Sequence, residues 1–295
     1  MKKQLFILII FISGVIPGCN TGTVNDLKPN YNAPSFIIDS HMHYEGTDEW
    51  EKSFLEIYTE HNAMACLMMS MDDLERGIAF AKAHPDRVIP YAAIEIDSPT
   101  VAEDIIRVHD MGFKGLGELF ATGRWDYNDP KYDTIWALAE KLGMPVAPHT
   151  GNLSNGMMAH LRPSFLADVA ATHPDLYIHA AHFGNPWYEE AAEATRRNKN
   201  LYFDFSGSSL IKKENDPHFW AQWLWWTDAI GKPHMPKDAV PAWEKILFAT
   251  DEGPDALMEN IRRFNKVLDA CGVDAATREK CYGLTLAKIY GIQVP

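Results

Sequence analysis

Apolar runs of strand length recur along the chain, and each is followed by a longer segment with the spacing of an amphipathic or turn-capped helix. The predicted strands are Phe36–Asp39, Ala63–Met68, Val88–Ile94, Gly115–Leu119, Val146–His149, Tyr177–His182, Leu201–Phe205 and Ile246–Thr250. Helices are predicted between them, among others at Asp72–Ala83, Val101–Met111, Tyr132–Leu142, Ser164–Thr172 and Trp187–Arg197. An uninterrupted alternation of strand and helix requires a parallel sheet, and eight such units close into a barrel. We therefore predict an α/β fold of the (β/α)8 TIM barrel type.

Proline and glycine mark where several of these helices end. At Ala83–Asp86 and Thr172–Asp175, a His-Pro pair closes a helix just before a strand. A histidine at a helix C-terminus interacts favourably with the helix dipole, so we interpret both histidines as structural. The alternative fold is an open, doubly wound sheet. It is disfavoured because the first strand leads into Asp39–His43 and not into a Gly-rich dinucleotide-binding loop.

The first residues are typical of an export signal. Lys2 and Lys3 precede an apolar run at residues 5–12, which is too short to cross a bilayer of ~30 Å as a helix. The segment Ile16–Cys19 resembles the lipobox of bacterial lipoproteins, in which the cysteine becomes the lipid-bearing first residue.

This reading divides the chain into three parts. We predict a signal peptide at residues 1–18, a lipidated tether at 19–34 that begins with Cys19, and a single barrel domain at 35–295. The mature protein would then be an exported bacterial lipoprotein, anchored to the membrane on the periplasmic side or at the cell surface. A secreted protein without lipid is the alternative.

Charge and cysteine content narrow the range of partners. The chain has 27 basic and 40 acidic residues, a formal net charge of −13, and loss of the two signal lysines would make it −15. This excess of acidic residues argues against nucleic acid as a partner. Besides Cys19, the sequence has only Cys66, Cys271 and Cys281, which is no disulfide framework. A single bridge between Cys271 and Cys281 stays open.

Side chains with metal-binding chemistry stand at the carboxyl ends of five predicted strands. His41 and His43 are two residues apart, so both project from the first strand to the same side. The others are Glu118, His149, His182 and Asp251, at the ends of the fourth, fifth, sixth and eighth strands. The carboxyl ends of barrel strands meet at one mouth, where this fold has its active site. We expect a metal ion there, because a buried polar group without a partner is costly.

The ligand types indicate which ion and which chemistry to expect. Imidazole nitrogen and carboxylate oxygen suit Zn²⁺, although Fe, Mn, Co and Ni accept the same ligands. Three histidines and one aspartate with an open position would form a catalytic site. Such an ion lowers the pKa of a bound water towards ~7 and polarises a carbonyl, so hydroxide is the expected nucleophile.

Four segments taken together resemble the amidohydrolase superfamily, and most closely its amidohydrolase-related branch. They are Ile38–His43, Gly143–Gly151, Ile178–Gly184 and Leu247–Asp251, in the family's order over nearly the whole mature chain. The resemblance implies that His41, His43, His149 and Asp251 are metal ligands. It also implies that His182 binds metal or hydrogen-bonds the reactive water, and that Asp251 doubles as a proton acceptor.

The fourth and sixth strands hold residues that need separate interpretation. Glu118 resembles the bridging carboxylate of two-metal members, whereas many members of the branch have no acid there and hold one metal. Lys114, if carboxylated, is the alternative bridge, but it precedes Glu118 by four residues and would lie deeper. A salt-bridged barrel residue is the structural alternative for Glu118, so the number of ions, one or two, stays open. His179 is expected on the face opposite to His182, packed in the shell of the barrel.

Two features near the mouth are candidates for substrate contact. Arg124 and Trp125 follow Glu118 in a loop, where an arginine can clamp a carboxylate; an ordinary surface arginine is the alternative. The segment 206–243 is aromatic and longer than a simple connection. We favour core packing for it over a lid, a pocket wall, a contact between copies of the chain in a homo-oligomer, or a patch on the membrane.

Three functions follow, in order of preference. The first is a metal-dependent hydrolase that cleaves a C–O or C–N bond of a small ester, lactone or amide, with Asp251 and His182 managing protons. The second is a metal-dependent non-oxidative decarboxylase or hydratase of a small carboxylic acid. The third is a lipid-anchored binding protein that keeps the site without turnover.

Overall fold

The computed structural model of the protein describes residues 34–122, 125–153, 158–207, 209–210, 213–226, 235 and 239–294. The signal peptide, Cys19 and nearly all of the tether lie outside these residues, and so does Arg124. Their roles, and the domain boundaries, therefore stay predictions. In the described part of the chain, no helix combines the length and the apolar character that a membrane span requires.

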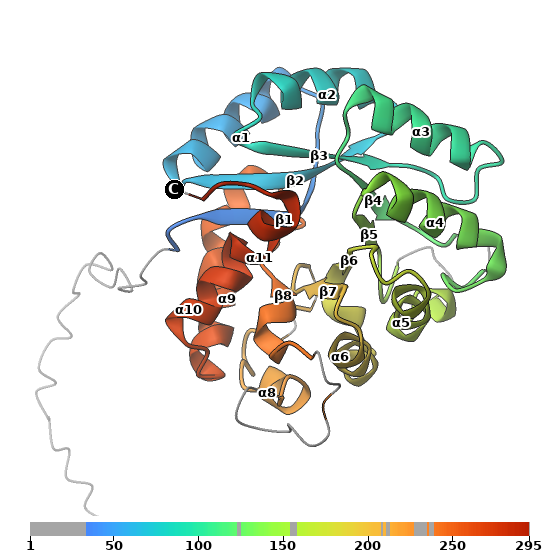
Figure 1. Cartoon of the computed structure of the whole chain (residues 1–295). Helices are drawn as coiled ribbons and strands as arrows, with labels where there is room; N and C mark the ends of the chain where they lie inside the picture. The colour runs from blue at the N-terminus through green and yellow to red at the C-terminus, as the bar shows by residue number, and fades with distance from the viewer. Residues whose placement is uncertain are drawn as a thin grey trace, which may run out of the picture. The chain divides into compact units, whose positions relative to one another are not determined.

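Eight strands of the described chain form one parallel sheet, with each strand beside its neighbours in the sequence (Figure 1). They are β1 Ile37–His43, β2 Ala63–Ser70, β3 Val88–Ala93, β4 Gly115–Leu119, β5 Val146–Pro148, β6 Ile178–Ala180, β7 Leu201–Asp204 and β8 Ile246–Leu247. The residues that follow β8 are joined to β1 by backbone hydrogen bonds from Ser40 N to Phe248 O (2.9 Å) and from Asp251 N to His41 O (2.8 Å). The predicted (β/α)8 barrel is confirmed.

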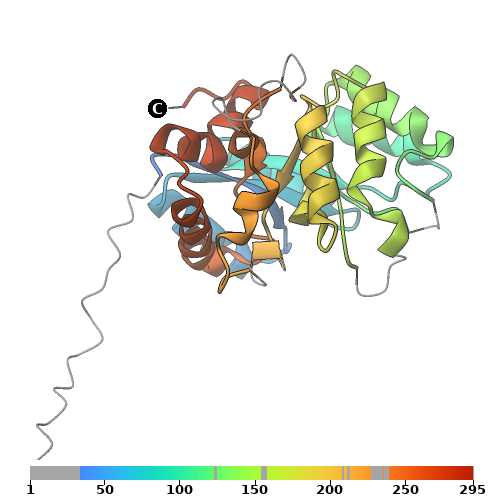
Figure 2. The same cartoon turned by 90° about the horizontal axis from the view of Figure 1, so that it is seen from below.

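Helices cover the outside of the strands. The α-helices are α1 Asp48–Glu60, α2 Leu74–Ala83, α3 Val101–Met111, α4 Asp133–Leu142, α5 Pro163–Thr172, α6 Tyr188–Arg197, α8 Phe219–Trp223, α9 Leu257–Ala270, α10 Ala275–Glu279 and α11 Thr285–Tyr290. Shorter turns are η1 Pro130–Tyr132, η2 Met158–His160, η3 Ala181–Gly184, η5 Ala242–Lys245, η6 Pro254–Ala256 and the π turn η7 Lys280–Leu284. Seen from below, the strands lie between the C-terminal helices in red and those of the middle of the chain in yellow and green (Figure 2).

The second strand illustrates why the barrel strands are apolar on both faces. Its alternate residues pack outward under the helices, Ala63, Ala65, Leu67 and Met69, or inward, Met64, Cys66 and Met68. A parallel strand buried on both faces needs such a continuous apolar run. Outside it, α1 buries Trp50, Phe54 and Tyr58 at helical spacing, and the Thr47 hydroxyl caps its start by accepting from Trp50 N at 3.2 Å.

The three strands that lead to His149, His182 and Asp251 end earlier than predicted, and these site residues therefore stand after their strands. The strand β5 stops at Pro148 and β8 at Leu247, so His149 and Asp251 follow their strands. His182, predicted as the last residue of a strand, lies in η3 with a φ of 66°. A strand end followed at once by a turn lets a side chain reach over the mouth of the barrel.

The expectation that His179 packs in the shell of the barrel is wrong. Its ring stacks on Tyr91 at 5.3 Å, and Tyr91 belongs to the apolar cluster inside the barrel. The alternation of faces holds only within a strand, and η3 interrupts it, so His179 and His182 both face the interior. Space for Tyr91 exists because residue 115 is glycine, where a Cβ would lie 2.4 Å from the tyrosine ring.

The aromatic segment 206–243, for which the sequence analysis favoured core packing, contributes to the core through its described residues. Trp220 and Trp226 are fully buried, and the ring of Trp220 lies 4.3 Å from that of Phe205. Trp225, in contrast, is 36% exposed. Residues 227–234 and 236–238 lie outside the described chain.

The cysteines of the domain are free thiols. Cys281 donates to Trp243 O at 3.0 Å, and Cys271 donates to Pro217 O at 3.5 Å. The bridge between Cys271 and Cys281 that the sequence left open is therefore not formed.

Candidate metal centre

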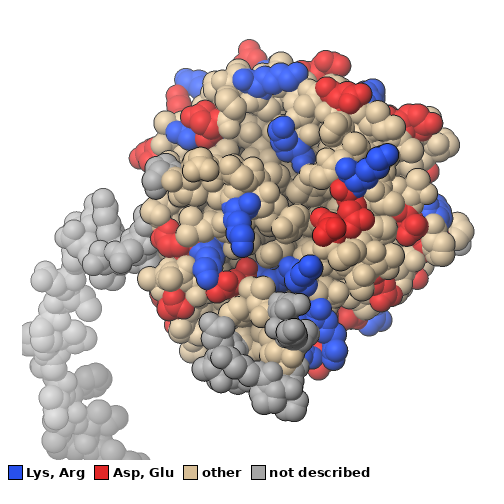
Figure 3. Space-filling model, viewed as in Figure 1, with Lys and Arg blue, Asp and Glu red and all other residues tan. Residues whose placement is uncertain are grey.

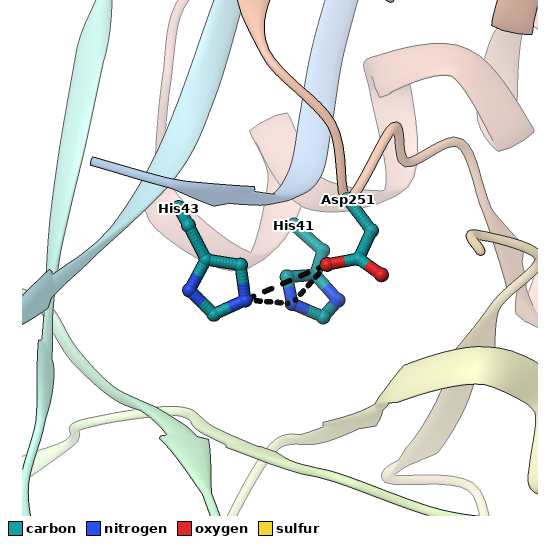
Figure 4. A group of neighbouring side chains, drawn as sticks. All are labelled: His41, His43 and Asp251. Carbon is teal, nitrogen blue, oxygen red and sulfur yellow. Dashed lines mark hydrogen bonds and ion pairs between the residues drawn. The ribbon is translucent and has the colours of Figure 1, made fainter. Parts of the chain in front are cut away.

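The first strand presents His41 and His43 to the same side, as predicted. Their Nε2 atoms lie 3.3 Å apart, and Oδ1 of Asp251 lies 3.5 Å from each (Figure 4). Asp251 has a φ of 53°, so the chain turns at this residue, four positions after the end of β8. The His41 side chain is buried, whereas that of His43 is 49% exposed, so the group opens to solvent on the His43 side.

Glu118 joins this group to a second one. Its Oε2 lies 3.5 Å from His41 Nε2 and 3.4 Å from His43 Nε2. Its Oε1 lies 2.7 Å from His149 Nδ1 and 3.4 Å from His182 Nε2. The carboxylate is buried at the end of β4, whereas Lys114 is exposed at the opposite end of that strand. One carboxylate thus contacts two pairs of histidines, one through each oxygen.

The donor spacing fits a small divalent ion. His41 Nε2, His43 Nε2, Glu118 Oε2 and Asp251 Oδ1 lie 3.3–3.5 Å apart in the five pairs measured above. Two atoms bound to one tetrahedral Zn²⁺ at ~2.1 Å lie about 3.4 Å apart, so each of these five separations fits two ligands of one ion. His149 and His182 offer further nitrogens on the other side of Glu118, and His149 Nε2 is buried with no hydrogen-bond partner among the described residues.

Charges within this buried group control one another's ionisation. Burial alone would raise the pKa of Glu118, but the charge of His41 and hydrogen bonds from His149 and His182 hold that pKa well below its usual range. Burial would lower the pKa of His41, yet Glu118 and Asp204 raise it well above the usual value. A metal can bind these nitrogens only when the imidazoles are unprotonated, so affinity is expected to fall at acid pH.

Comparison of the sequence with protein families decides the assignment. A family model described as "Amidohydrolase" matches residues 39–292. The chain belongs to the amidohydrolase family. It is an enzyme of that superfamily, whose members use a divalent metal, and the match supports the amidohydrolase-related branch that the sequence resembles. No curated protein matches the chain.

Solved structures with the same fold are distant in sequence. One from Acinetobacter baumannii, described as a probable 2-pyrone-4,6-dicarboxylic acid hydrolase with citric acid bound, is 13% identical with a TM-score of 0.56, over 86% of this chain and 99% of that one. An uncharacterised TIM-barrel protein from Bordetella bronchiseptica is 17% identical with a TM-score of 0.62, over 87% of this chain and 98% of that one. A 5-carboxyvanillate decarboxylase from Novosphingobium aromaticivorans, complexed with manganese and a nitrobenzoic acid, is 14% identical, TM-score 0.53, over 87% and 96%. At these identities the likeness shows the shared fold.

Sequence reasoning missed Asp204 and Ser206 among the residues of this amidohydrolase's site. Asp204 ends β7, is fully buried, and has an oxygen 3.4 Å from His41 Nδ1. Burial would raise the pKa of Asp204, but His41 and His182 hold it well below its usual range. The signal was present in the sequence, since Asp204 stands at the end of a predicted strand as the other candidates do. Its role was hidden because the sequence does not show which ring nitrogens a buried carboxylate faces.

Asp39 is a second buried carboxylate that the sequence analysis did not single out. It accepts hydrogen bonds from Tyr58 Oη (2.8 Å), Thr250 Oγ1 (2.7 Å) and the backbone N–H of His41 (3.1 Å). Burial raises the pKa of its carboxyl to about 6. Asp39 contacts no imidazole nitrogen among these partners, so its part is to tie β1 to α1 and to the turn after β8.

The predicted substrate contacts lie in the loop between β4 and α4. Arg124 is outside the described residues. Trp125 is 44% exposed, and Lys131 Nζ lies 4.6 Å from the centre of its ring. On the face shown in Figure 3, basic and acidic side chains are interspersed. Contact of Trp125 with a substrate stays a prediction.

Proposed function

We propose that this protein is a metal-dependent hydrolase that holds two divalent ions, one on each side of Glu118. The observation that carries the proposal is the placement of the Glu118 carboxylate. One oxygen lies 3.4–3.5 Å from the Nε2 atoms of His43 and His41, and the other lies 2.7 Å from His149 Nδ1. A carboxylate shared by two clusters of nitrogen donors is the arrangement that a bridging ligand requires.

The proposed roles divide the site into two halves. His41, His43 and Asp251 would hold the first ion, His149 and His182 the second, and Glu118 both. Imidazole and carboxylate donors at these separations suit Zn²⁺ best, and Mn²⁺, Fe²⁺ or Co²⁺ share the ligand preference. When bound, such ions lower the pKa of a coordinated water and polarise a carbonyl oxygen.

Asp251 is our candidate for the proton acceptor. Its Oδ1 faces the two histidines of β1, while Oδ2 lies 3.9 Å from His182 Nδ1 and is not engaged by either. The side chain is 24% exposed, so substrate can reach it from the mouth. We propose that Asp251 takes the proton as water attacks and returns it to the leaving group, the usual cycle of a general acid–base residue.

The proposed reaction is hydrolysis of a C–O or C–N bond in a small ester, lactone or amide. A bridged pair of ions would support hydrolysis because the two charges can stabilise both the attacking oxygen of water and the charge that develops on the carbonyl oxygen. The name of the Acinetobacter baumannii structure, a probable pyrone dicarboxylic acid hydrolase, supports the same class.

Metal analysis of the purified protein tests this proposal. We expect about two ions per chain in the wild type, and one or none in Glu118→Gln, whose neutral amide cannot bridge as a carboxylate does. An ester, lactone and amide panel should then find activity in the wild type that Glu118→Gln loses. A wild type that binds no divalent ion after growth and dialysis with Zn²⁺ or Mn²⁺ would refute the proposal.

Non-oxidative decarboxylation of a small carboxylic acid is the second candidate function. The observation in its favour is that a structural neighbour with manganese is a 5-carboxyvanillate decarboxylase. One ion per chain, together with release of CO2 from an aromatic acid panel and no hydrolysis, would favour this function over the first. In that case Glu118 would be a hydrogen-bonding partner of His149 and not a bridge.

A further inference from the structure

Two histidines that belong to different halves of the site turn their Nδ1 atoms towards the same carboxylate, that of Asp204. His41 faces Glu118 and Asp251 with Nε2, and its Nδ1 lies 3.4 Å from Asp204 Oδ2. His182 faces Glu118 with Nε2 at 3.4 Å, and its Nδ1 lies 2.9 Å from Ser206 Oγ. The Ser206 hydroxyl in turn donates to Asp204 Oδ1 at 2.6 Å.

The two oxygens of Asp204 thus contact two different groups: the first branch is His41, and the second branch is Ser206 with His182. Oδ2 lies at an ion-pair distance of 3.4 Å from His41 Nδ1, a buried nitrogen with no hydrogen-bond partner among the described residues. Oδ1 accepts from the Ser206 hydroxyl and from the backbone N–H groups of His182 (3.0 Å) and Ser206 (2.9 Å), and so fixes both the ring and the main chain of the second branch. The carboxylate is 1% exposed, and a buried charge persists only where such partners compensate it.

We infer that Asp204 is a positioning residue that orients one ligand histidine of each proposed ion, directly for His41 and through Ser206 for His182. The inference rests on the proposed two-ion site. A histidine that binds metal through Nε2 must carry its proton on Nδ1, and an acceptor beside Nδ1 selects that tautomer and ring orientation. Because one carboxylate serves both branches, the two ions are coupled through Asp204 as well as through Glu118.

Asp204→Asn tests the inference by stepwise titration of the metal-free protein with Zn²⁺ against a chelating indicator. The amide can turn its NH2 towards His41 Nδ1 and favour the tautomer that blocks Nε2. We expect the affinity of both steps to fall ~10–100-fold, the usual effect of losing an outer partner of a ligand histidine. Absorption of the Co²⁺-loaded protein should change at both sites, which a merely structural residue would not cause.

Ser206→Ala separates the two branches. It removes one hydroxyl oxygen and leaves the contact between Asp204 and His41 in place. We expect it to weaken the step that belongs to His149 and His182 and to leave the other step as in the wild type. Asp39→Asn is the matched control, a buried carboxylate bonded to the backbone of His41 and not to its ring. It should lower the melting temperature while both metal affinities stay at the wild-type values.

The outcomes distinguish this inference from the proposed function. A wild type that binds no ion contradicts the proposed function itself. A wild type that binds two ions, with unchanged affinities in Asp204→Asn, leaves the function standing and overturns the positioning role. If Asp204→Asn does not fold, Ser206→Ala tests the inference instead. The inference is overturned if Ser206→Ala binds zinc at each of the two steps with the same affinity as the wild type.

Discussion

One oxygen of Glu118 lies 2.7 Å from His149 Nδ1, while the other lies 3.4 Å from His43 Nε2, so a single buried side chain spans the two sides of the barrel mouth. His43 and His149 are separated by more than a hundred residues of the chain. They meet because the carboxyl ends of barrel strands converge. Because Glu118 contacts histidines of both halves of the site, we expect substitutions in the two halves to affect different ions.

Replacing one histidine from each half should remove different ions. In His149→Ala we expect one ion per chain to remain, because His41, His43 and Asp251 are untouched. His41→Ala should lose the ion of the first half, and both variants should lose activity. Metal content by mass spectrometry, with circular dichroism to show a folded barrel, checks this. Full metal content in both variants would contradict the ligand assignment.

Gly207 offers a test of how closely the site is packed. It has a φ of 59°, and a Cβ there would lie 3.1 Å from Asp251 Oδ2 and 3.2 Å from His182 Nδ1. We expect Gly207→Ala to lose about 1 kcal/mol of stability from the left-handed backbone conformation and, in addition, most of its activity. The measurement is kcat/KM beside the free energy of unfolding in urea.

Gly272→Ala is the control for that substitution. Gly272 has a similar φ of 65°, but nothing lies within 4 Å of where its Cβ would be. It should show the same backbone cost with unchanged kcat/KM. Equal activities in the two variants would mean that Gly207 does not limit the space beside Asp251.

Lys245, a buried residue outside the metal centre, is expected to make the stability of the protein depend on pH. Its Nζ is buried and donates to Asn198 O (3.0 Å) and Lys199 O (2.7 Å), and burial holds the pKa of the ammonium well below its usual value. The unfolded chain therefore binds a proton that the folded chain binds less readily, so this residue makes stability rise with pH up to the unfolded pKa of ~10.4. Urea unfolding of wild type and Lys245→Met between pH 7 and pH 10 should show the wild type gaining relative to the variant. A constant difference over that range would show that Lys245 stays charged in the fold.

The sequence predicted most of the barrel because parallel strands leave a strong local signal. The run Ala63–Ser70 is apolar on both faces, and Gly115–Leu119 and Val101–Met111 have the predicted bounds. The ends of β5, β6 and β8 were less predictable, since turns over a barrel mouth follow from tertiary contacts. His182 shows this: its φ of 66° depends on the bonds that its backbone N–H and Nδ1 make to Asp204 and Ser206.

The candidate site was predictable as a set of residues but not as a network. Residue type and position at strand ends singled out His41, His149 and Asp251. They did not single out Asp204, because the role of a buried carboxylate is defined by which ring nitrogens it faces, and spacing along the chain does not contain that. The turn at η3, which puts His179 and His182 on the same interior side, was hidden for the same reason.

Asp251→Asn separates the two roles proposed for Asp251, ligand and proton acceptor. The substitution keeps the size of the side chain and one carbonyl oxygen, but removes its charge and basicity. Metal binding should weaken, but excess metal should still saturate the variant, because His41, His43 and Glu118 keep their donor atoms. If Asp251 takes the proton of the attacking water, kcat of the metal-saturated variant should fall by ~10²–10⁴, the range usual for a general acid–base group, while KM changes much less. Near-normal turnover in metal-saturated Asp251→Asn would assign the proton to another group, for which His182 is the candidate, since its Nδ1 lies 3.9 Å from Asp251 Oδ2. That result would also favour decarboxylation over hydrolysis, because no attacking water loses a proton in a decarboxylation.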